Sequence, residues 1–218
     1  MGKSALASLY ALAAAARGER VTVFLFDEGV GAWLERTRGL GYDPQPHLAA
    51  GTLELCQLNP TEVSPGRLAQ GVVERVEGQG VRLVVLDTLN GYMAAMPDEE
   101  LLSLHVHELV SYLNGRGVLT ILTMVQHGLV GSVEAPLEVS YLTDTVLYLR
   151  YFEAQGEVRK CLSVIKKRTG NHERQLRELR FDPEGGVTIG EQLRAFSGVL
   201  TGVPRYEGAP GDLMADQG

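Results

Sequence analysis

The feature of this sequence that most constrains its fold is a series of short apolar runs separated by helical patterns. The runs Val21–Phe26, Val81–Leu86 and Val118–Met124 are rich in β-branched and other apolar residues. Strands that are buried on both faces have this composition, and intervening helices supply the right-handed crossovers that parallel strands need. The alternation therefore predicts an α/β fold, in which a mostly parallel sheet is flanked by helices.

The other expected elements follow from capping and turn signals. Ser64 before Pro65 is a typical helix N-cap, and Asp98 caps a helix whose first turn carries acids that suit the helix dipole. Helices are expected over 5–17, 33–40, 65–77 and 98–115, with a short strand over 53–57. From Thr143 onward, strand-like runs around Gln155-Gly156 and Pro183-Glu184-Gly185 predict antiparallel hairpins, which we place at the edge of the sheet.

Composition narrows the class of protein. The 218 residues suit one large domain, which we place at 1–207, with a disordered Gly-, Pro- and Asp-rich tail at 208–218. A formal net charge of −7 disfavours a surface built mainly to bind nucleic acid. No apolar stretch approaches the roughly 18 to 20 residues of a membrane span, so we expect a cytoplasmic protein. Cys56 and Cys161 have no C-x-x-C spacing, which favours two buried, inert thiols.

The residues that suggest chemistry begin at the N-terminus. Gly2-Lys3-Ser4 directly precedes a helical run and matches the tail of the phosphate-binding pattern G-x-x-x-x-G-K-[ST]. In that pattern Lys3 reaches the β- and γ-phosphates, Ser4 ligates Mg²⁺, and the helix N-terminus faces the anion. We expect the domain to lack its first strand and the first half of this loop, through either a misassigned start or a fragment.

Three strand ends add acids and an amide at the edge where open α/β sheets bind ligands. Asp87 follows an apolar strand as in a Walker B element, whose carboxylate holds the Mg²⁺ shell. Asp27 and Glu28 follow another strand, and one of them can orient and deprotonate water. Gln126 follows the third strand, and its side-chain amide can sense the γ-phosphate through a hydrogen bond. A solvated acidic turn and an unliganded loop amide are the alternative interpretations.

A basic segment, Lys166-Lys167-Arg168, stands at the end of a later strand-like run. It is either a solvated turn or a phosphate clamp, since Arg and Lys neutralise the charge of a transferring phosphoryl group and an arginine finger contributes about 10³- to 10⁵-fold in rate. Its sequence distance from Lys3 favours a clamp that a neighbouring subunit inserts, and activity would then require a ring.

In their order along nearly the whole chain, these motifs resemble KaiC-type ATPases of the RecA superfamily. The resemblance rests on 26–28, 87–88, 140–145, 166–172 and 198–204. It implies a RecA-like P-loop NTPase core, ATP and Mg²⁺ as ligands, and a hexameric ring with nucleotide at subunit interfaces. The resemblance assigns phosphate and Mg²⁺ binding to Lys3 and Ser4, and the role of the Walker B acid to Asp87. The catalytic acidic pair is assigned to Asp27 and Glu28. The residues that act on a neighbour's nucleotide are Lys166, Arg168 and His172.

The chain also departs from the family pattern. The family has Glu-Glu where this chain has Asp27-Glu28, so Glu28 is expected to be the principal base. Ser140 matches a phosphoacceptor position, but Tyr141 replaces the neighbouring Thr, which weakens the case for autokinase activity. We expect an ATPase associated with signalling and with a signalling protein as partner. The alternatives are a non-hydrolysing, nucleotide-gated scaffold and a recombinase-like DNA-binding protein, which the acidic balance disfavours.

Overall fold

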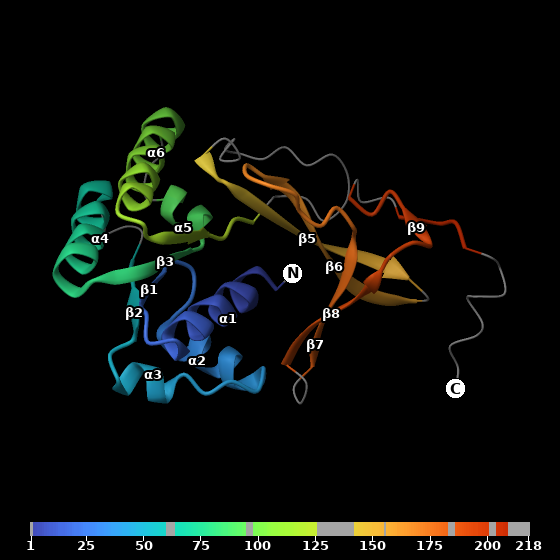
Figure 1. Ribbon diagram of the computed structural model, residues 1–218, viewed down its shortest axis with the longest axis horizontal. Coiled ribbons are helices and arrows are strands. Elements are labelled where there is room, and N and C mark those ends of the chain that lie inside the picture. Colours follow the sequence, from blue (N-terminus) through green and yellow to red (C-terminus); the bar gives the residue numbers. More distant parts are fainter. Residues whose placement is uncertain are drawn as a thin grey trace. The chain divides into compact units, whose positions relative to one another are not determined.

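The computed structural model describes residues 2–59, 64–94, 98–125, 142–154, 156–182, 186–200 and 204–208. The chain divides into two compact units, Gly2–Val125 and Gln126–Gly218. The first unit contains helices and a parallel sheet, and the second contains antiparallel strands (Figure 1). Each unit is described by itself below.

The sheet of the first unit has the strand order β2-β1-β3-β4. Its members are β1 (Arg20–Leu25), β2 (Leu53–Gln57), β3 (Val81–Asp87) and β4 (Leu119–Leu122). Every neighbouring pair is parallel, and β1 lies between β2 and β3. In the pairing of β1 with β3, Leu25 is in register with Asp87. The predicted α/β fold with a parallel sheet is confirmed.

Helices cover both faces of this sheet (Figure 1). They are α1 (Lys3–Ala16), α2 (Val30–Gly39), α3 (Gln45–Ala49), α4 (Pro65–Gln79), α5 (Leu89–Ala94) and α6 (Glu99–Gly115). Successive residues of β1 point to opposite faces. Val23 packs in one apolar cluster with residues of α1 and with Trp33 of α2. Phe24 faces the other way, and its ring lies under the Arg75 guanidinium of α4.

The predicted helix caps are present. Ser64 Oγ accepts a hydrogen bond from the Arg67 amide at 3.3 Å, and the Asp98 carboxylate accepts from the amides of Glu100 and Leu101. The sequence did not indicate α3 and α5, because five or six residues are too few to show a helical period.

The second unit is built on antiparallel strands. They are β5 (Thr145–Ala154), β6 (Glu157–Lys167), β7 (Arg177–Asp182) and β8 (Gly186–Gln192), in that spatial order, and a two-stranded ribbon of β9 (Phe196–Ser197) and β10 (Arg205–Tyr206). The predicted hairpins are confirmed. Their predicted place is corrected: within the described residues they form a sheet of their own and do not extend the parallel one. An apolar cluster that includes Phe152, Cys161 and Val199 forms the core of this unit.

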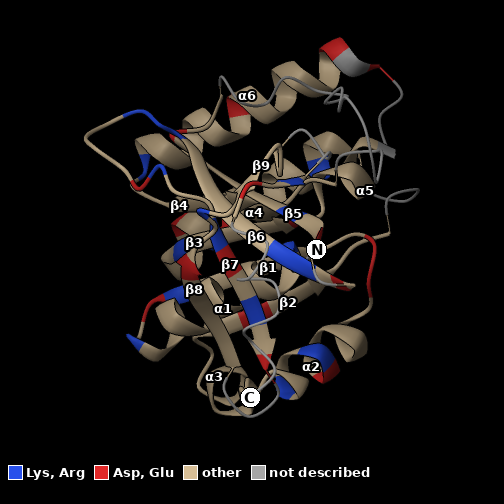
Figure 2. Cartoon of the chain, turned by 90° about the vertical axis from the view of Figure 1, so that its right-hand side faces the viewer, with Lys and Arg blue, Asp and Glu red and all other residues tan. Residues whose placement is uncertain are grey.

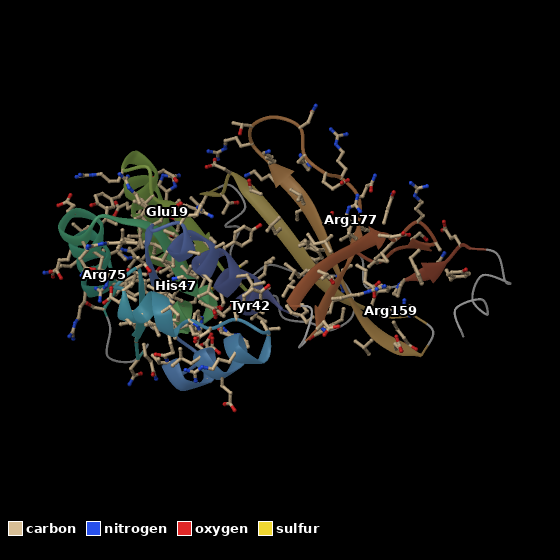
Figure 3. All side chains as sticks on the ribbon, turned by 60° about the horizontal axis from the view of Figure 1, so that its bottom comes forward. Glu19, Tyr42, His47, Arg75, Arg159 and Arg177 are labelled. Atoms are coloured by element: carbon tan, nitrogen blue, oxygen red, sulfur yellow. The ribbon has the colours of Figure 1, made fainter. Side chains whose placement is uncertain are left out.

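Charged side chains of both signs are interspersed along the chain (Figure 2). Arg75 on α4, labelled in Figure 3, is one of them. It donates hydrogen bonds of 2.8 Å from Nε and Nη2 to the two carboxylate oxygens of Glu54 on β2. Burial raises the pKa of the Cys56 thiol to about 11, which agrees with an inert cysteine.

In the part of the chain that the structure describes, no helix combines the length and hydropathy of a membrane crossing.

Candidate functional site

The carboxyl ends of β1 and β3 bring three predicted acids to one edge of the first unit. The two strands are neighbours, so Asp87 at the end of β3 lies beside the end of β1, which Asp27 and Glu28 follow. Asp87 is only 3% exposed, Glu28 is half-buried and Asp27 is exposed. A buried carboxylate is costly unless it accepts hydrogen bonds.

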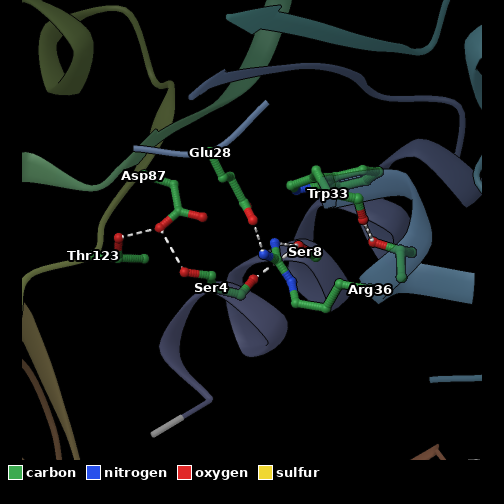
Figure 4. A network of polar contacts seen from close by, with 8 residues as sticks. Ser4, Ser8, Glu28, Trp33, Arg36, Asp87 and Thr123 are labelled. Carbon is green, nitrogen blue, oxygen red and sulfur yellow. Dashed lines mark hydrogen bonds and ion pairs between the residues drawn. The ribbon is translucent and has the colours of Figure 1, made fainter. Parts of the chain in front are cut away.

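Two hydroxyl groups donate hydrogen bonds to one oxygen of the Asp87 carboxylate. Ser4 Oγ donates to Asp87 Oδ1 at 2.8 Å, and Thr123 Oγ1 donates to the same oxygen at 2.5 Å (Figure 4). Ser4 lies in the first turn of α1, so this bond joins the predicted phosphate-binding residues to the predicted Walker B acid. Thr123 was missed from sequence. The register pairs Leu86 with Leu122, so Asp87, the last residue of β3, lies beside Thr123, the first residue after β4. A polar residue within an apolar run was the available signal.

The N-terminus of α1 has the properties of an anion site. Gly2 precedes it with a φ of 92°, a left-handed conformation that favours glycine. Within the described chain, no side chain caps the helix and its first turn carries no acid. The first amides of a helix lack intrahelical acceptors, and the helix dipole favours a negative charge beside them.

Lys3 stands at this helix start and is half-buried. Burial lowers the pKa of its ammonium group, and the negative charge of Asp87 partly opposes that shift. Desolvation disfavours a charged amine, whereas nearby negative charge favours it. A phosphate group at the start of α1 would therefore stabilise the charged form of Lys3.

Glu28 is held by an arginine from the helix that follows it. Arg36 on α2 donates from Nη1 to Glu28 Oε2, and its Nη2 contacts Ser8 Oγ of α1 at 3.3 Å. Ser8 Oγ in turn donates to the carbonyl oxygen of Ser4 at 2.8 Å. A chain of polar contacts thus links Glu28 to Ser4 and Asp87, and Figure 4 shows these residues together. Arg36 was also missed, because its role depends on the position of α2.

Asp27 is held by the segment that follows β3. Thr88 Oγ1 donates to Asp27 Oδ2, and the amide of Gly91 on α5 donates to Thr88 Oγ1 at 3.3 Å. A Cβ atom on Gly91 would lie closer than 3.0 Å to both Phe26 and Asp27. The absence of a side chain at Gly91 therefore permits the approach of α5 to Asp27.

The remaining predicted site residues come after Val125 in the sequence, beyond the first unit. Gln126 and Ser140 fall outside the described residues. Lys166 is near the end of β6 in the second unit, and Arg168 and His172 follow that strand. Arg168 Nη1 forms an ion pair with Asp144 Oδ1 at 3.0 Å, in which both side chains are more than half exposed.

The donor set at Ser4 and Asp87 fits Mg²⁺. The described residues contain no group of three or more His, Cys, Asp or Glu side chains that could hold a metal ion by themselves. Magnesium in nucleotide sites is typically held by one or two protein oxygen ligands together with phosphate oxygens and water. The Ser4 hydroxyl and the Asp87 carboxylate are oxygen donors of this kind.

Comparison with known proteins places the chain in a family. A family model described as "ATPase: KaiC" matches residues 1–194. The chain belongs to the KaiC ATPase family. The recognised resemblance and the RecA-like α/β core are thereby confirmed, and the match runs across both units of this KaiC-family chain.

Curated relatives agree with this family. The chain is 25% identical over 209 residues to "Circadian clock protein KaiC3" of Synechocystis, covering 94% of this chain and 40% of that protein. It is 27% identical over 206 residues to "Circadian clock protein KaiC2" of the same organism, covering 94% and 36%. A third relative, "Circadian clock oscillator protein KaiC" of Picosynechococcus, is 22% identical over 204 residues, covering 93% and 39%. The chain thus spans about two fifths of the length of these relatives.

Proposed function

We propose that this KaiC-family domain binds ATP with Mg²⁺ at the Ser4–Asp87 cluster and hydrolyses the γ-phosphate. The observation that carries the proposal is the 2.8 Å hydrogen bond between Ser4 and Asp87. It joins a residue of the phosphate-binding pattern to an acid 83 positions away at the end of a neighbouring element. Both residue types are those that a nucleotide-bound Mg²⁺ uses.

Each residue of the cluster has a role in this reaction. Lys3 and the first amides of α1 hold the β- and γ-phosphates, and Gly2 permits the turn that leads into the helix. Ser4 and Asp87 would hold Mg²⁺, which neutralises charge on the phosphate oxygens when bound. Gln126 is proposed to contact the γ-phosphate.

The hydrolytic step needs a base next to the attacking water. Glu28 accepts a hydrogen bond from that water and takes its proton as the oxygen attacks the γ-phosphorus. The bond between the γ-phosphorus and the β,γ-bridging oxygen breaks, and ADP leaves with that oxygen. Asp27 is the second acid of the pair and is held by Thr88.

A ring would complete the site with cations from a neighbouring copy. Lys166, Arg168 and His172 are proposed to contact the neighbour's nucleotide, and the exposed Arg168 can exchange Asp144 for a phosphate. The proposed assembly is a hexamer in the cytoplasm that acts on a signalling partner, with Ser140 as a phosphoacceptor if the domain phosphorylates itself. Sedimentation with and without ATP tests the assembly, and a monomer under both conditions would contradict it.

The replacement Glu28→Gln tests the hydrolytic assignment. Removal of a general base typically lowers a rate by about 10²- to 10⁴-fold, so phosphate release should fall by at least about 100-fold. ATP binding, followed with a fluorescent analogue, should stay close to that of the unmodified chain. Glu35→Gln on the exposed side of α2 is the matched control and should leave both measurements unchanged. Unchanged phosphate release in Glu28→Gln would contradict the assignment.

A second candidate function is a nucleotide-gated scaffold that binds ATP without hydrolysing it. The ion pair between Glu28 and Arg36 favours this alternative, because it engages one oxygen of the proposed base. ATP-dependent assembly in the absence of phosphate release would select it over the ATPase.

A further inference from the structure

The ion pair between Glu28 and Arg36 is more than a surface contact. Exposed pairs are worth little because water and salt screen them, and the two side chains here are only 23% and 27% exposed, respectively. Arg36 lies in the second half of α2 and reaches back to Glu28, which stands in the loop between β1 and the start of that helix. Loss of one partner would leave the other charge partly buried without compensation.

The two oxygens of Glu28 have different surroundings. Oε2 accepts the hydrogen bond from Arg36 Nη1. Oε1 is buried and has no hydrogen-bond partner among the residues that the structure describes. A buried polar atom without a partner is uncommon in proteins and calls for a ligand or a water molecule. Oε1 is therefore the oxygen that is available to accept a hydrogen bond from the attacking water.

Arg36 also fixes Glu28 relative to the phosphate-binding residues. The same guanidinium group contacts Ser8 Oγ at 3.3 Å, and the Ser8 hydroxyl donates to the carbonyl oxygen of Ser4 at 2.8 Å. A planar guanidinium can contact two acceptors at once in a fixed geometry, which a lysine ammonium on a flexible chain does not reproduce. These contacts thus connect Glu28, through α2, to the first turn of α1.

We propose that Arg36 is a positioning residue for hydrolysis: it anchors Glu28 by Oε2, directs Oε1 toward the attacking water and ties both to the first turn of α1. This inference rests on the proposed ATPase function. Arg36 is not assigned a contact with ATP, so its effect is expected on the chemical step and not on nucleotide binding. A misplacement of about 1 Å in a reacting group can cost roughly 10²-fold in rate.

The test compares Arg36→Gln with Arg38→Gln in the full chain. Arg38 is the same residue type on the same helix and is exposed. In Arg36→Gln, kcat for phosphate release should fall about 10- to 100-fold while KM for ATP changes less than about threefold. Arg38→Gln should match the unmodified chain. Arg36→Lys should recover part of kcat, because it restores the charge beside Glu28 without the contact to Ser8, and it also serves if Arg36→Gln fails to fold.

The double variant Glu28→Gln/Arg36→Gln separates positioning from general damage. If Arg36 acts through Glu28, the double variant should hydrolyse ATP no more slowly than Glu28→Gln alone. A double variant in which the losses of kcat from the two single variants multiply would overturn the inference. A kcat of Arg36→Gln or Arg36→Lys equal to that of Arg38→Gln would also overturn it. In that last case Glu28→Gln can still be inactive, which leaves the ATPase proposal intact. Absence of ATP binding by the unmodified chain would instead overturn the ATPase proposal and this inference together.

Discussion

At the scale of single residues, the site depends on close approaches between side chains of different helices, strands and loops. Ser4 and Thr123 share one oxygen of Asp87, Arg36 returns to Glu28, and Gly91 lies against the Asp27 side chain. The contact at Gly91 leaves no room for a methyl group, because Cβ would meet Phe26 and Asp27 at less than 3.0 Å.

The replacement Gly91→Ala should therefore destabilise the fold and displace Asp27. Overpacking of a well-packed site typically costs about 1 to 3 kcal/mol in the free energy of unfolding, which urea titration measures. Gly66→Ala on α4 is the control, since a Cβ atom there meets nothing within 4 Å and alanine favours a helix. Equal free energies of unfolding for the two variants would show that the approach at Gly91 is not constrained.

The sequence could predict one class of site residue and not the other. Lys3 and Ser4 belong to a local pattern, and Asp87 ends an apolar run, so a motif or a strand end reveals each of them. Arg36 and Thr123 have no local signature, because the helix position and the parallel register decide what they contact.

At the scale of secondary structure, α5 and α6 support the strand end that carries Asp27. Tyr92 of α5 is fully buried, and its ring lies 5.5 Å from that of Phe26 and 5.9 Å from that of His105 on α6, measured between centroids. Burial lowers the pKa of His105, and the negative charge of Glu108 partly opposes this shift. The sequence predicted α6 from its cap and length, whereas α5 is too short for a periodic signal.

This packing predicts a stability that depends on pH. Since the pKa of His105 is lower in the folded state than its ordinary value of 6.5, the unfolded chain binds more protons below that pH. The stabilising contribution is complete above pH 6.5 and is lost as the pH falls through the window below it. The melting temperature of His105→Gln should therefore fall less between pH 7.5 and 5.5 than that of the unmodified chain. His107→Gln on the exposed side of α6 should retain the full dependence, and equal slopes for all three proteins would refute this explanation.

At the scale of the whole molecule, the family match covers both units and the charge is distributed over them. The match to residues 1–194 includes the parallel sheet and the antiparallel strands β5 to β8. Hairpin signals predicted those strands because turns are local, but their separate sheet could not be predicted, since pairing between strands is set by contacts distant in sequence. The net charge of −7 and the mixture of signs disfavour a surface built mainly to bind nucleic acid.

Calorimetric titration of ATP, with Mg²⁺ and with a chelator, tests the Ser4–Asp87 site most directly. The unmodified chain should bind ATP at least about tenfold more tightly with Mg²⁺, a difference of about 1.4 kcal/mol, because Ser4 and Asp87 supply oxygen ligands to the nucleotide-bound ion. Asp87→Asn should lose most of that Mg²⁺ dependence. No binding heat from the unmodified chain, or an equal effect of Mg²⁺ on both proteins, would contradict the proposed site.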